Sequence, residues 1–184
     1  MRTEIRVLLS SVFAILICGA SAASAQGTSW GDLAVSAGRV DFDLSGTGNG
    51  RTLVVRATRQ LSSHVDLEFR GLYSKYCGDQ FLGKCEPNGL RGSTSLFIPE
   101  AQLQYRWVLG RVSPYVGGGI GAARVQSALH TDWDPTFSAA VGSAVYLTDR
   151  LGITGEFRLR GHERRFTGTT SEVSAGVVWR LSSF

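Results

Sequence analysis

Long apolar segments are scarce in this sequence of 184 residues. After residue 20, no apolar run approaches the roughly 20 residues that a membrane-spanning helix needs. A membrane helix is therefore excluded for the rest of the chain. If these residues cross a membrane, they do so as strands of a closed barrel, because backbone polar groups cannot stay unpaired in hydrocarbon.

Cysteine and histidine, which often bind transition metals, are also few. The sequence has three of each, and of the cysteines only Cys77 and Cys85 lie beyond the N-terminal apolar run. No histidine stands at ligand spacing around them, which disfavours a zinc site. In an oxidising compartment we expect these two cysteines to pair and close a small loop. The sequence predicts no metal and no cofactor.

The N-terminus has the features of a secretory signal peptide. Arg2 and Arg6 precede an apolar run over residues 7–20, and residues 23–25 supply the small side chains that signal peptidase accepts. A membrane anchor would need a longer run, and a lipoprotein site at Cys18 would need a residue smaller than Ile17 before it. We therefore assign residues 1–25 to a signal peptide and 26–184 to one exported domain.

Charge is nearly balanced in the exported part. Of the 19 basic and 15 acidic residues, Arg2, Arg6 and Glu4 fall in the leader, which leaves 17 and 14 and a net charge of +3. This mild basicity does not indicate nucleic-acid binding, and an exported protein rarely meets nucleic acid.

The exported sequence is organised in short alternating segments. In HVDLEFRGLY, residues 64–73, apolar Val65, Leu67 and Phe69 alternate with charged residues. A period of two is typical of a strand with two unlike faces. The same pattern recurs after each turn signal. We expect eight strands, near residues 30–40, 51–60, 64–73, 98–108, 114–125, 136–147, 151–160 and 172–181.

The connections between these strands differ in length. Those at 61–64, 109–113 and 148–150 are short, whereas those at 41–50, 74–97, 126–135 and 161–171 are longer and rich in small polar residues. Short and long connections alternate along the chain. This asymmetry is typical of an up-and-down outer-membrane barrel with tight periplasmic turns and longer external loops.

The phase of the alternation predicts what the barrel encloses. With the apolar faces in lipid, charges of both signs converge on one interior. The inward set includes Arg56, Asp66, Glu68, Arg70, Glu100, Arg106, Glu156, Arg158, Arg160 and Arg180. Side chains alone fill the interior of an eight-stranded barrel, so we expect these acids and bases to pair. The short turn after the second strand predicts that Arg56 lies near Glu68.

The outward phase contains residues suited to membrane boundaries. Trp107 and Trp179 fall near the short turns and Tyr73 near the long connections, where interfacial aromatic residues are expected. Basic Arg39, Arg51 and Arg124 are expected at the external rim. A strip of small outward residues forms either a thin lipid-facing surface or a contact surface: Gly118, Ala122, Ala139 and Ser143.

On three segments the sequence resembles the small eight-stranded outer-membrane β-barrel proteins, the group of the OmpA transmembrane domain, OmpX and Ail. These segments are PYVGGGIGAARV, LTDRLGITGEFRLR and SAGVVWRLSSF, and the resemblance extends over about residues 27–184. It implies an all-β fold: an eight-stranded antiparallel transmembrane barrel in a Gram-negative-type outer membrane. It also implies a non-enzymatic role carried by external loops, in membrane integrity, adhesion or surface protection.

The resemblance further implies recognition by the barrel assembly machinery through the C-terminal strand and its final Phe184. The sequence departs from the group here, because Val177, Trp179 and Leu181 share one phase of the strand and Phe184 has the other. A frayed end or a bulge would account for the change of phase.

An enzyme acting on surrounding lipid is the first alternative. A lipid A deacylase of the PagL type needs a histidine beside a nucleophilic serine. The candidates are His130 with Ser127 and His162 with Ser171. No His-x-Ser arrangement occurs, which disfavours catalysis. A second alternative is a small channel or a carrier of hydrophobic molecules, and the crowded interior argues against a wide pore.

Two features remain as contact hypotheses. The segment YCGDQFLGKCEPNG presents Phe81 and Leu82 either to a partner or to the barrel mouth. Arginine suits phosphate because its planar guanidinium binds two oxygens. The candidate contacts with anionic lipopolysaccharide are Arg39, Arg51, Arg124, Arg164 and Arg165.

Overall fold

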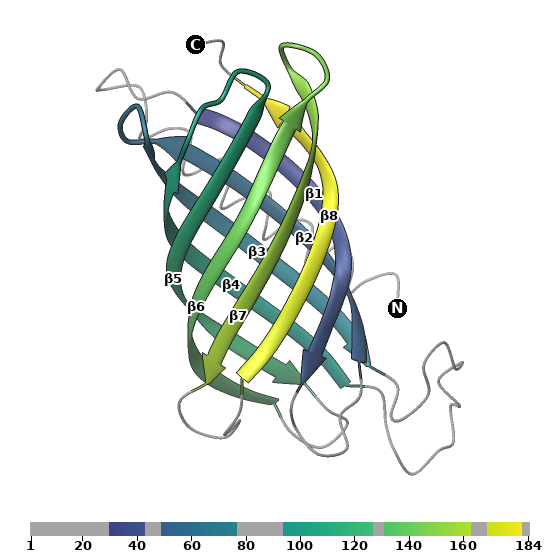
Figure 1. Cartoon of the computed structure of the whole chain (residues 1–184). Coiled ribbons are helices and arrows are strands. Elements are labelled where there is room, and N and C mark those ends of the chain that lie inside the picture. Colours follow the sequence, from purple (N-terminus) through teal and green to yellow (C-terminus); the bar gives the residue numbers. More distant parts are fainter. Residues whose placement is uncertain (1–29, 43–48, 77–93, 127–130, 163–168, 182–184) are drawn as a thin grey trace.

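The computed structural model describes residues 30–42, 49–76, 94–126, 131–162 and 169–181. These residues form eight strands joined in chain order into one closed barrel (Figure 1). The strands are β1 (Trp30–Phe42), β2 (Asn49–Gln60), β3 (Val65–Tyr76), β4 (Thr94–Arg106), β5 (Val112–Gln126), β6 (Thr131–Tyr146), β7 (Leu151–His162) and β8 (Thr169–Arg180). The described part of the chain contains no helix with the length and apolarity of a membrane span.

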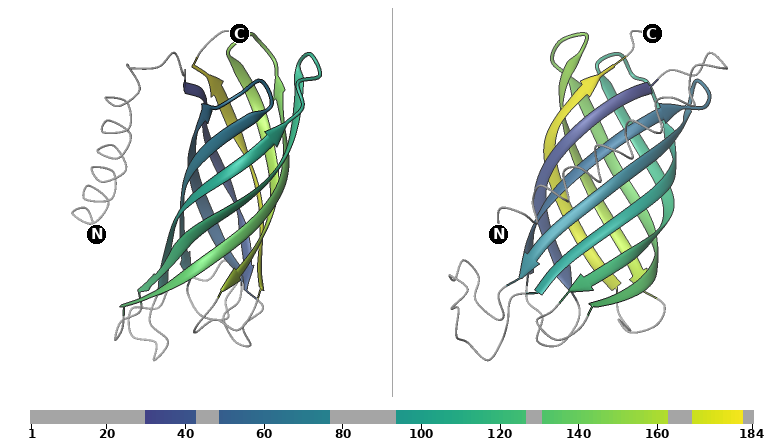
Figure 2. Two further views of the ribbon diagram at one scale, coloured as in Figure 1. Left: turned by 90° about the vertical axis from the view of Figure 1, so that its left-hand side faces the viewer. Right: turned by 180° about the vertical axis from the view of Figure 1, so that it is seen from behind.

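Every neighbouring pair is antiparallel, and β1 pairs with β8 to close the wall. Figure 2 shows the tilted strands from two further sides. Closure leaves no strand edge exposed, which satisfies the backbone without water. The predicted fold class is therefore confirmed.

Tight turns lie together at one end of the barrel (Figure 1). The N–H groups of Leu61 and Ser62 donate to the Val65 carbonyl at 2.9 and 3.0 Å, and Leu147 N–H donates to Leu151 O at 2.9 Å. Between β4 and β5 the chain reverses at Gly110, whose φ of 64° favours glycine. We call this the short-turn end and the opposite one the long-loop end.

Several strands extend further toward the long-loop end than predicted. β4 begins at Thr94, and β6 begins at Thr131 where a loop was expected over 126–135. The interval between β5 and β6 is residues 127–130, so the predicted long connection is wrong there. The polar composition of TDWDP suggested a loop, but its alternation continues, with Trp133 exposed and Asp134 buried.

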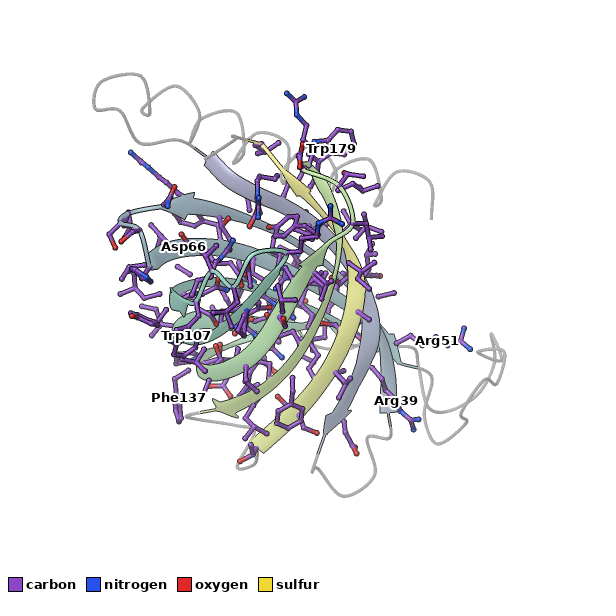
Figure 3. All side chains as sticks on the ribbon, turned by 45° about the horizontal axis from the view of Figure 1, so that its top comes forward. Arg39, Arg51, Asp66, Trp107, Phe137 and Trp179 are labelled. Carbon is purple, nitrogen blue, oxygen red and sulfur yellow. The ribbon has the colours of Figure 1, made fainter. Side chains whose placement is uncertain are left out.

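The two faces of each strand match the predicted phase. Along β7, Ile153 is 52% exposed on the outside, whereas Arg158 and Arg160 are 0% exposed on the inside. Figure 3 shows Trp179 at the short-turn end and Arg39 and Arg51 at the long-loop end, all pointing away from the barrel. Apolar side chains outside and charges inside are the reverse of a soluble barrel.

Inward glycines of β5 make room for the side chains of β4. A Cβ on Gly117 would lie 2.6 Å from Gln102 Nε2, and one on Gly121 would lie 2.7 Å from Glu100 Cγ. The glycines of β5 therefore have no side chains on the inner face of the wall, and polar side chains of β4 occupy that space.

The interior also holds apolar clusters that the sequence analysis did not identify. Toward the long-loop end of β2–β5, the buried cluster contains Val54, Leu72, Leu96, Ile98 and Ala123. Near the short-turn end, a second cluster contains Ala34, Ala144, Tyr146 and Val178.

Candidate functional site

The lumen is occupied by a network centred on Glu156 of β7. Its carboxylate lies 2.9 Å from Arg56 Nη1 and 3.0 Å from Arg158 Nε, and it also pairs with Arg70. The Tyr115 hydroxyl donates to it at 2.8 Å. Strands β2, β3, β5 and β7 thus meet at one carboxylate in the middle of the barrel.

Three further glutamates complete this network. Glu100 accepts two bonds from Arg160 at 2.8 and 3.0 Å. Glu68 lies 3.2 Å from Arg158, and Glu172 lies 2.7 Å from Arg160 and also pairs with Arg70. We call this set of eight residues the central network: Arg56, Arg70, Arg158, Arg160, Glu68, Glu100, Glu156 and Glu172. Four positive and four negative charges leave it neutral, as burial of ions requires.

The sequence predicted Arg56 beside Glu68, and the structure places Arg56 Nη1 3.7 Å from Glu68 Oε2. The two residues are not direct register partners, because Arg56 is opposite Arg70 and Glu68 is opposite Thr58. The closer partner of Arg56 is Glu156 on the far side of the barrel.

A second group, which we call the end cluster, lies toward the short-turn end and contains Asp32, Asp66, Arg106 and Arg180. Arg106 lies 2.5 Å from Asp32 and 2.8 Å from Asp66, and Arg180 lies 4.0 Å from Asp32. The Arg180 guanidinium also stacks 3.6 Å from the centre of the Tyr146 ring. Two positive and two negative charges again balance, and Asp32 connects β1 across the lumen to β4.

Removal of Arg106 tests the end cluster. We expect Arg106→Gln to destabilise the refolded barrel by about 3 kcal/mol, because two buried carboxylates lose their shared partner. Urea titration in lipid vesicles measures the change. The double variant R106Q/D66N should recover part of the loss. If the single variant were as stable as the wild type, the cluster would not contribute to stability.

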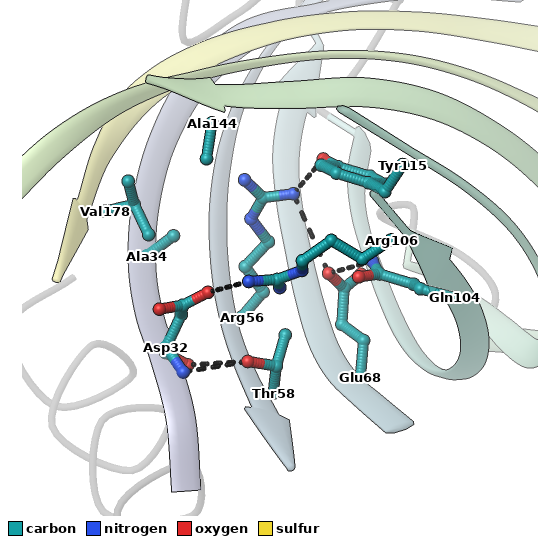
Figure 4. Close-up of a pocket in the computed structure, with 10 residues that line it drawn as sticks. All are labelled: Asp32, Ala34, Arg56, Thr58, Glu68, Gln104, Arg106, Tyr115, Ala144 and Val178. Atoms are coloured by element: carbon teal, nitrogen blue, oxygen red, sulfur yellow. Dashed lines mark hydrogen bonds and ion pairs between the residues drawn. The ribbon is translucent and has the colours of Figure 1, made fainter. Parts of the chain in front are cut away.

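Side chains leave little free volume between the two groups. A cavity of about 10 Å³ lies between them, lined in part by Arg56, Glu68, Arg106 and Tyr115 (Figure 4). This is about the space of one water molecule. The barrel wall therefore encloses a packed polar core.

The outward residues lie at the two rims as the phase predicted. Arg39, Arg51 and Arg124 are exposed near the long-loop ends of β1, β2 and β5. Arg124 lies 6.0 Å from the centre of the exposed Trp133 ring. The aromatic residues Trp107 and Trp179 are exposed at the short-turn end, and Tyr73 toward the other.

The small outward strip also has the predicted phase. Ala139 is exposed, and Gly118 is its register partner across β5 and β6. Ser143 and Ala122 are partly exposed on the same outer face of these two strands.

The candidate catalytic pair on β7 and β8 is not brought together. His162 faces the lumen, where its Nε2 lies 3.3 Å from Thr170 Oγ1. Ser171 lies between buried Thr170 and Glu172, so it has the outward phase. The wall of the barrel separates the histidine from the serine. Within the described ranges, no group of three metal-binding side chains is present.

Some predicted residues lie outside the described part of the chain. They are the signal peptide at 1–25, Cys77 and Cys85, Phe81 and Leu82, Ser127 and His130, Arg164 and Arg165, and Phe184. Their predicted roles stay predictions.

The sequence analysis did not identify several residues that belong to these two groups or contact them, among them Asp32, Glu172 and Tyr115. Asp32 and Glu172 stand near the ends of predicted strands. Asp32 has the same phase as Ser36 and Glu172 the same phase as Ser174, so the alternation would have placed both acidic residues inward. Tyr115 contacts the central network through its hydrogen bond to Glu156. Its inward phase in PYVGGG was the available signal.

Comparison with known proteins agrees with this architecture. Residues 10–180 match the family model for the outer membrane protein beta-barrel domain. The structure is similar to neisserial surface protein A (NspA), with TM-score 0.62 and 15% identity, covering 85% of this chain and 100% of that one. OprG from Pseudomonas aeruginosa gives TM-score 0.63 and 12% identity, with 83% of this chain and 97% of that one covered.

Ail, the attachment invasion locus protein of Yersinia pestis, gives TM-score 0.53 and 15% identity, covering 85% of this chain and 99% of that one. At these identities the likeness shows the fold alone. No match is found among curated proteins. The apolar outward faces and charged inward faces of the strands suit a lipid environment. The family match extends over nearly all of the barrel, and the chain therefore belongs to the outer membrane protein beta-barrel domain family.

Proposed function

We propose that this protein is a non-enzymatic outer-membrane barrel that presents its long-loop end to the exterior for adhesion, surface protection or membrane integrity. The observation that carries the proposal is the neutral central network, which fills the lumen with paired charges. Because paired side chains fill the lumen, the outer surface and the loops are the parts of the protein that can bind partners.

Export and assembly belong to the same proposal. The leader at 1–25 would direct the chain across the inner membrane. The last strand and Phe184 would be recognised by the barrel assembly machinery. The rigid wall would then hold the connections between strands, the longest of which is residues 77–93. A bond between Cys77 and Cys85 would stiffen that connection.

Similarity to Ail supports an attachment role. Ail is an attachment invasion locus protein and has been crystallised in complex with the heparin analogue sucrose octasulfate. This chain shares its fold and has basic residues at the long-loop rim, which would suit a sulfated polysaccharide as partner.

Surface display of the full chain tests the role of the loops. Cells of a Gram-negative host that express it should adhere to heparin-coated surfaces. A loop variant that combines a glycine-serine linker at residues 77–93 with R39Q/R51Q/R124Q should adhere about tenfold less, because it also removes the exposed basic residues of the rim. The matched control replaces exposed Asp149 and Arg150 of a short turn by Asn and Gln, and should leave adherence unchanged. Equal adherence of the loop variant and the wild type would contradict the proposal.

The enzymatic alternative has its own test. His162 and Ser171 lie on opposite faces of the wall, so we expect the lipid A extracted from expressing cells to keep its acyl chains. Mass spectrometry of that lipid measures the result. Loss of one acyl chain on expression would show that the barrel is an enzyme.

A further inference from the structure

The ladder between β4 and β5 is interrupted at one place. Phe97 and Glu100 of β4 pair with β5 in one continuous register, but Ile98 and Pro99 between them make no backbone pair with that strand. Proline has no N–H to donate to a ladder, which accounts for the loss. We call this place the β4–β5 interruption.

A second proline removes the alternative partner. The register places Pro99 of β4 opposite Ala122 of β5, and Pro135 of β6 is paired with Ala122 from the other side. In an antiparallel ladder, a carbonyl accepts its hydrogen bond from the residue directly opposite. Both residues opposite Ala122 lack an N–H, so neither neighbouring strand satisfies its carbonyl through the ladder. An unpaired carbonyl is costly where hydrocarbon surrounds the wall, and this point of the barrel is therefore weak.

Both faces of the wall are apolar at the β4–β5 interruption. On the inner face, Ile98 and Ala123 belong to the buried apolar cluster of the long-loop end. On the outer face, Pro99 and Ala122 are partly exposed, and the partner of Pro99 on β3 is Gly71. Small outward residues thus separate the apolar cluster from the lipid.

Toward the short turns, the inner face of the same two strands is polar. There β4 places Glu100, Gln102 and Gln104 in the lumen, and all three are buried. Separation of β4 from β5 at these residues would expose their polar groups to hydrocarbon, which is costly. At the β4–β5 interruption, separation brings one apolar environment into contact with another. Local opening of this strand pair is therefore least costly there.

We propose that β4 and β5 separate locally at the β4–β5 interruption and admit small apolar molecules from the surrounding lipid to the apolar cluster. The next inward residue of β4 after Ile98 is Glu100, whose pairing with Arg160 closes the lumen beyond the cluster. The guest therefore exchanges with the lipid and does not cross the membrane. This inference goes beyond the proposed function and does not depend on the loops.

Contact with dissolved oxygen tests the proposal, because molecular oxygen is small, apolar and paramagnetic. The refolded chain, with isotope-labelled methyl groups, is placed in lipid nanodiscs under oxygen pressure, and methyl relaxation is measured by NMR. We expect oxygen to increase the relaxation of Ile98 and Leu72 about fivefold more than that of Ala144 and Val178, which lie in the other apolar cluster.

Pro99→Ala supplies the missing N–H. It should reduce the effect of oxygen at Ile98 about fivefold and slow the exchange of the Ala122 amide hydrogen by a similar factor. The matched control is Pro135→Ala, because β5 and β6 stay paired at Ala122 in the presence of that proline. The control should change neither quantity.

Equal effects of oxygen at the two apolar clusters of the wild type would overturn the proposal, and this comparison decides alone if Pro99→Ala does not fold. An effect at Ile98 that Pro99→Ala leaves unchanged would also overturn it, because oxygen would then enter through the mouth of the barrel.

Discussion

Replacing Glu156 by alanine should destabilise the barrel by about 4 kcal/mol, the largest effect we expect from a single charge. The substitution leaves Arg56, Arg70 and Arg158 without their common partner in a lumen closed to water. It also removes the acceptor of the Tyr115 hydroxyl. An unpaired buried charge costs far more than the original pair gained, because the desolvation penalty stays when the attraction is lost.

The free energy of unfolding in lipid vesicles, from urea titration, measures this change. Glu156→Gln keeps the shape and removes the charge, so it should lose nearly as much stability as the alanine variant. The control Asp149→Asn removes an equal charge from an exposed turn and should change stability by less than about 0.5 kcal/mol. Equal effects at Glu156 and Asp149 would mean that the lumen is open to water.

Gly176→Ala should destabilise the barrel by about 3 kcal/mol by preventing close contact along the seam of β1 and β8. Gly176 faces inward opposite Ser36, and a Cβ there would collide with the carbonyl oxygen of Val35 and the Cα of Ser36. These are backbone atoms of the adjacent strand, so no rotation of a side chain relieves the overlap. The two strands would have to separate where the barrel closes.

Gly155→Ala is the matched control for the seam variant. Gly155 lies on the neighbouring strand β7 with nothing within 4 Å of the added Cβ. It should fold with unchanged stability or a gain of a few tenths of a kcal/mol, because alanine restricts the unfolded chain. Gel mobility before and after boiling reports closure of each variant. The seam would not be tightly packed if Gly176→Ala formed a closed barrel, with a gel mobility that changes on boiling, and had the same free energy of unfolding as the wild type.

Alternation made most of the fold predictable from the sequence. β7 shows why: Ile153, Phe157 and Leu159 are exposed, while Glu156 and Arg158 are buried. The same signal fails where both faces are apolar. The lumen buries Leu72, Leu96 and Ile98. In these parts of β3 and β4, the residues that face outward are also apolar. A pattern that contrasts polar with apolar residues cannot assign such a stretch to a face.

The sequence predicted the charged lumen but not its pairing. The pair of Arg56 and Glu156 joins β2 to β7 across the barrel, and that of Arg106 and Asp32 joins β4 to β1. Neither pair is adjacent in the sheet. Their approach depends on the tilt of the strands and on where β8 meets β1, which are properties of the closed barrel. The turns that can be predicted from the sequence indicate only which residues of neighbouring strands lie close together.

Conductance across a planar lipid bilayer most directly tests the central claim that the central network closes the lumen. With the refolded chain inserted, we expect no conductance steps above those of the bare bilayer, whereas a wide porin in the same bilayer gives discrete steps. Steps that require the chain and are unchanged when residues 77–93 are replaced would show a continuous path through the barrel, and would contradict the packed core on which this account rests.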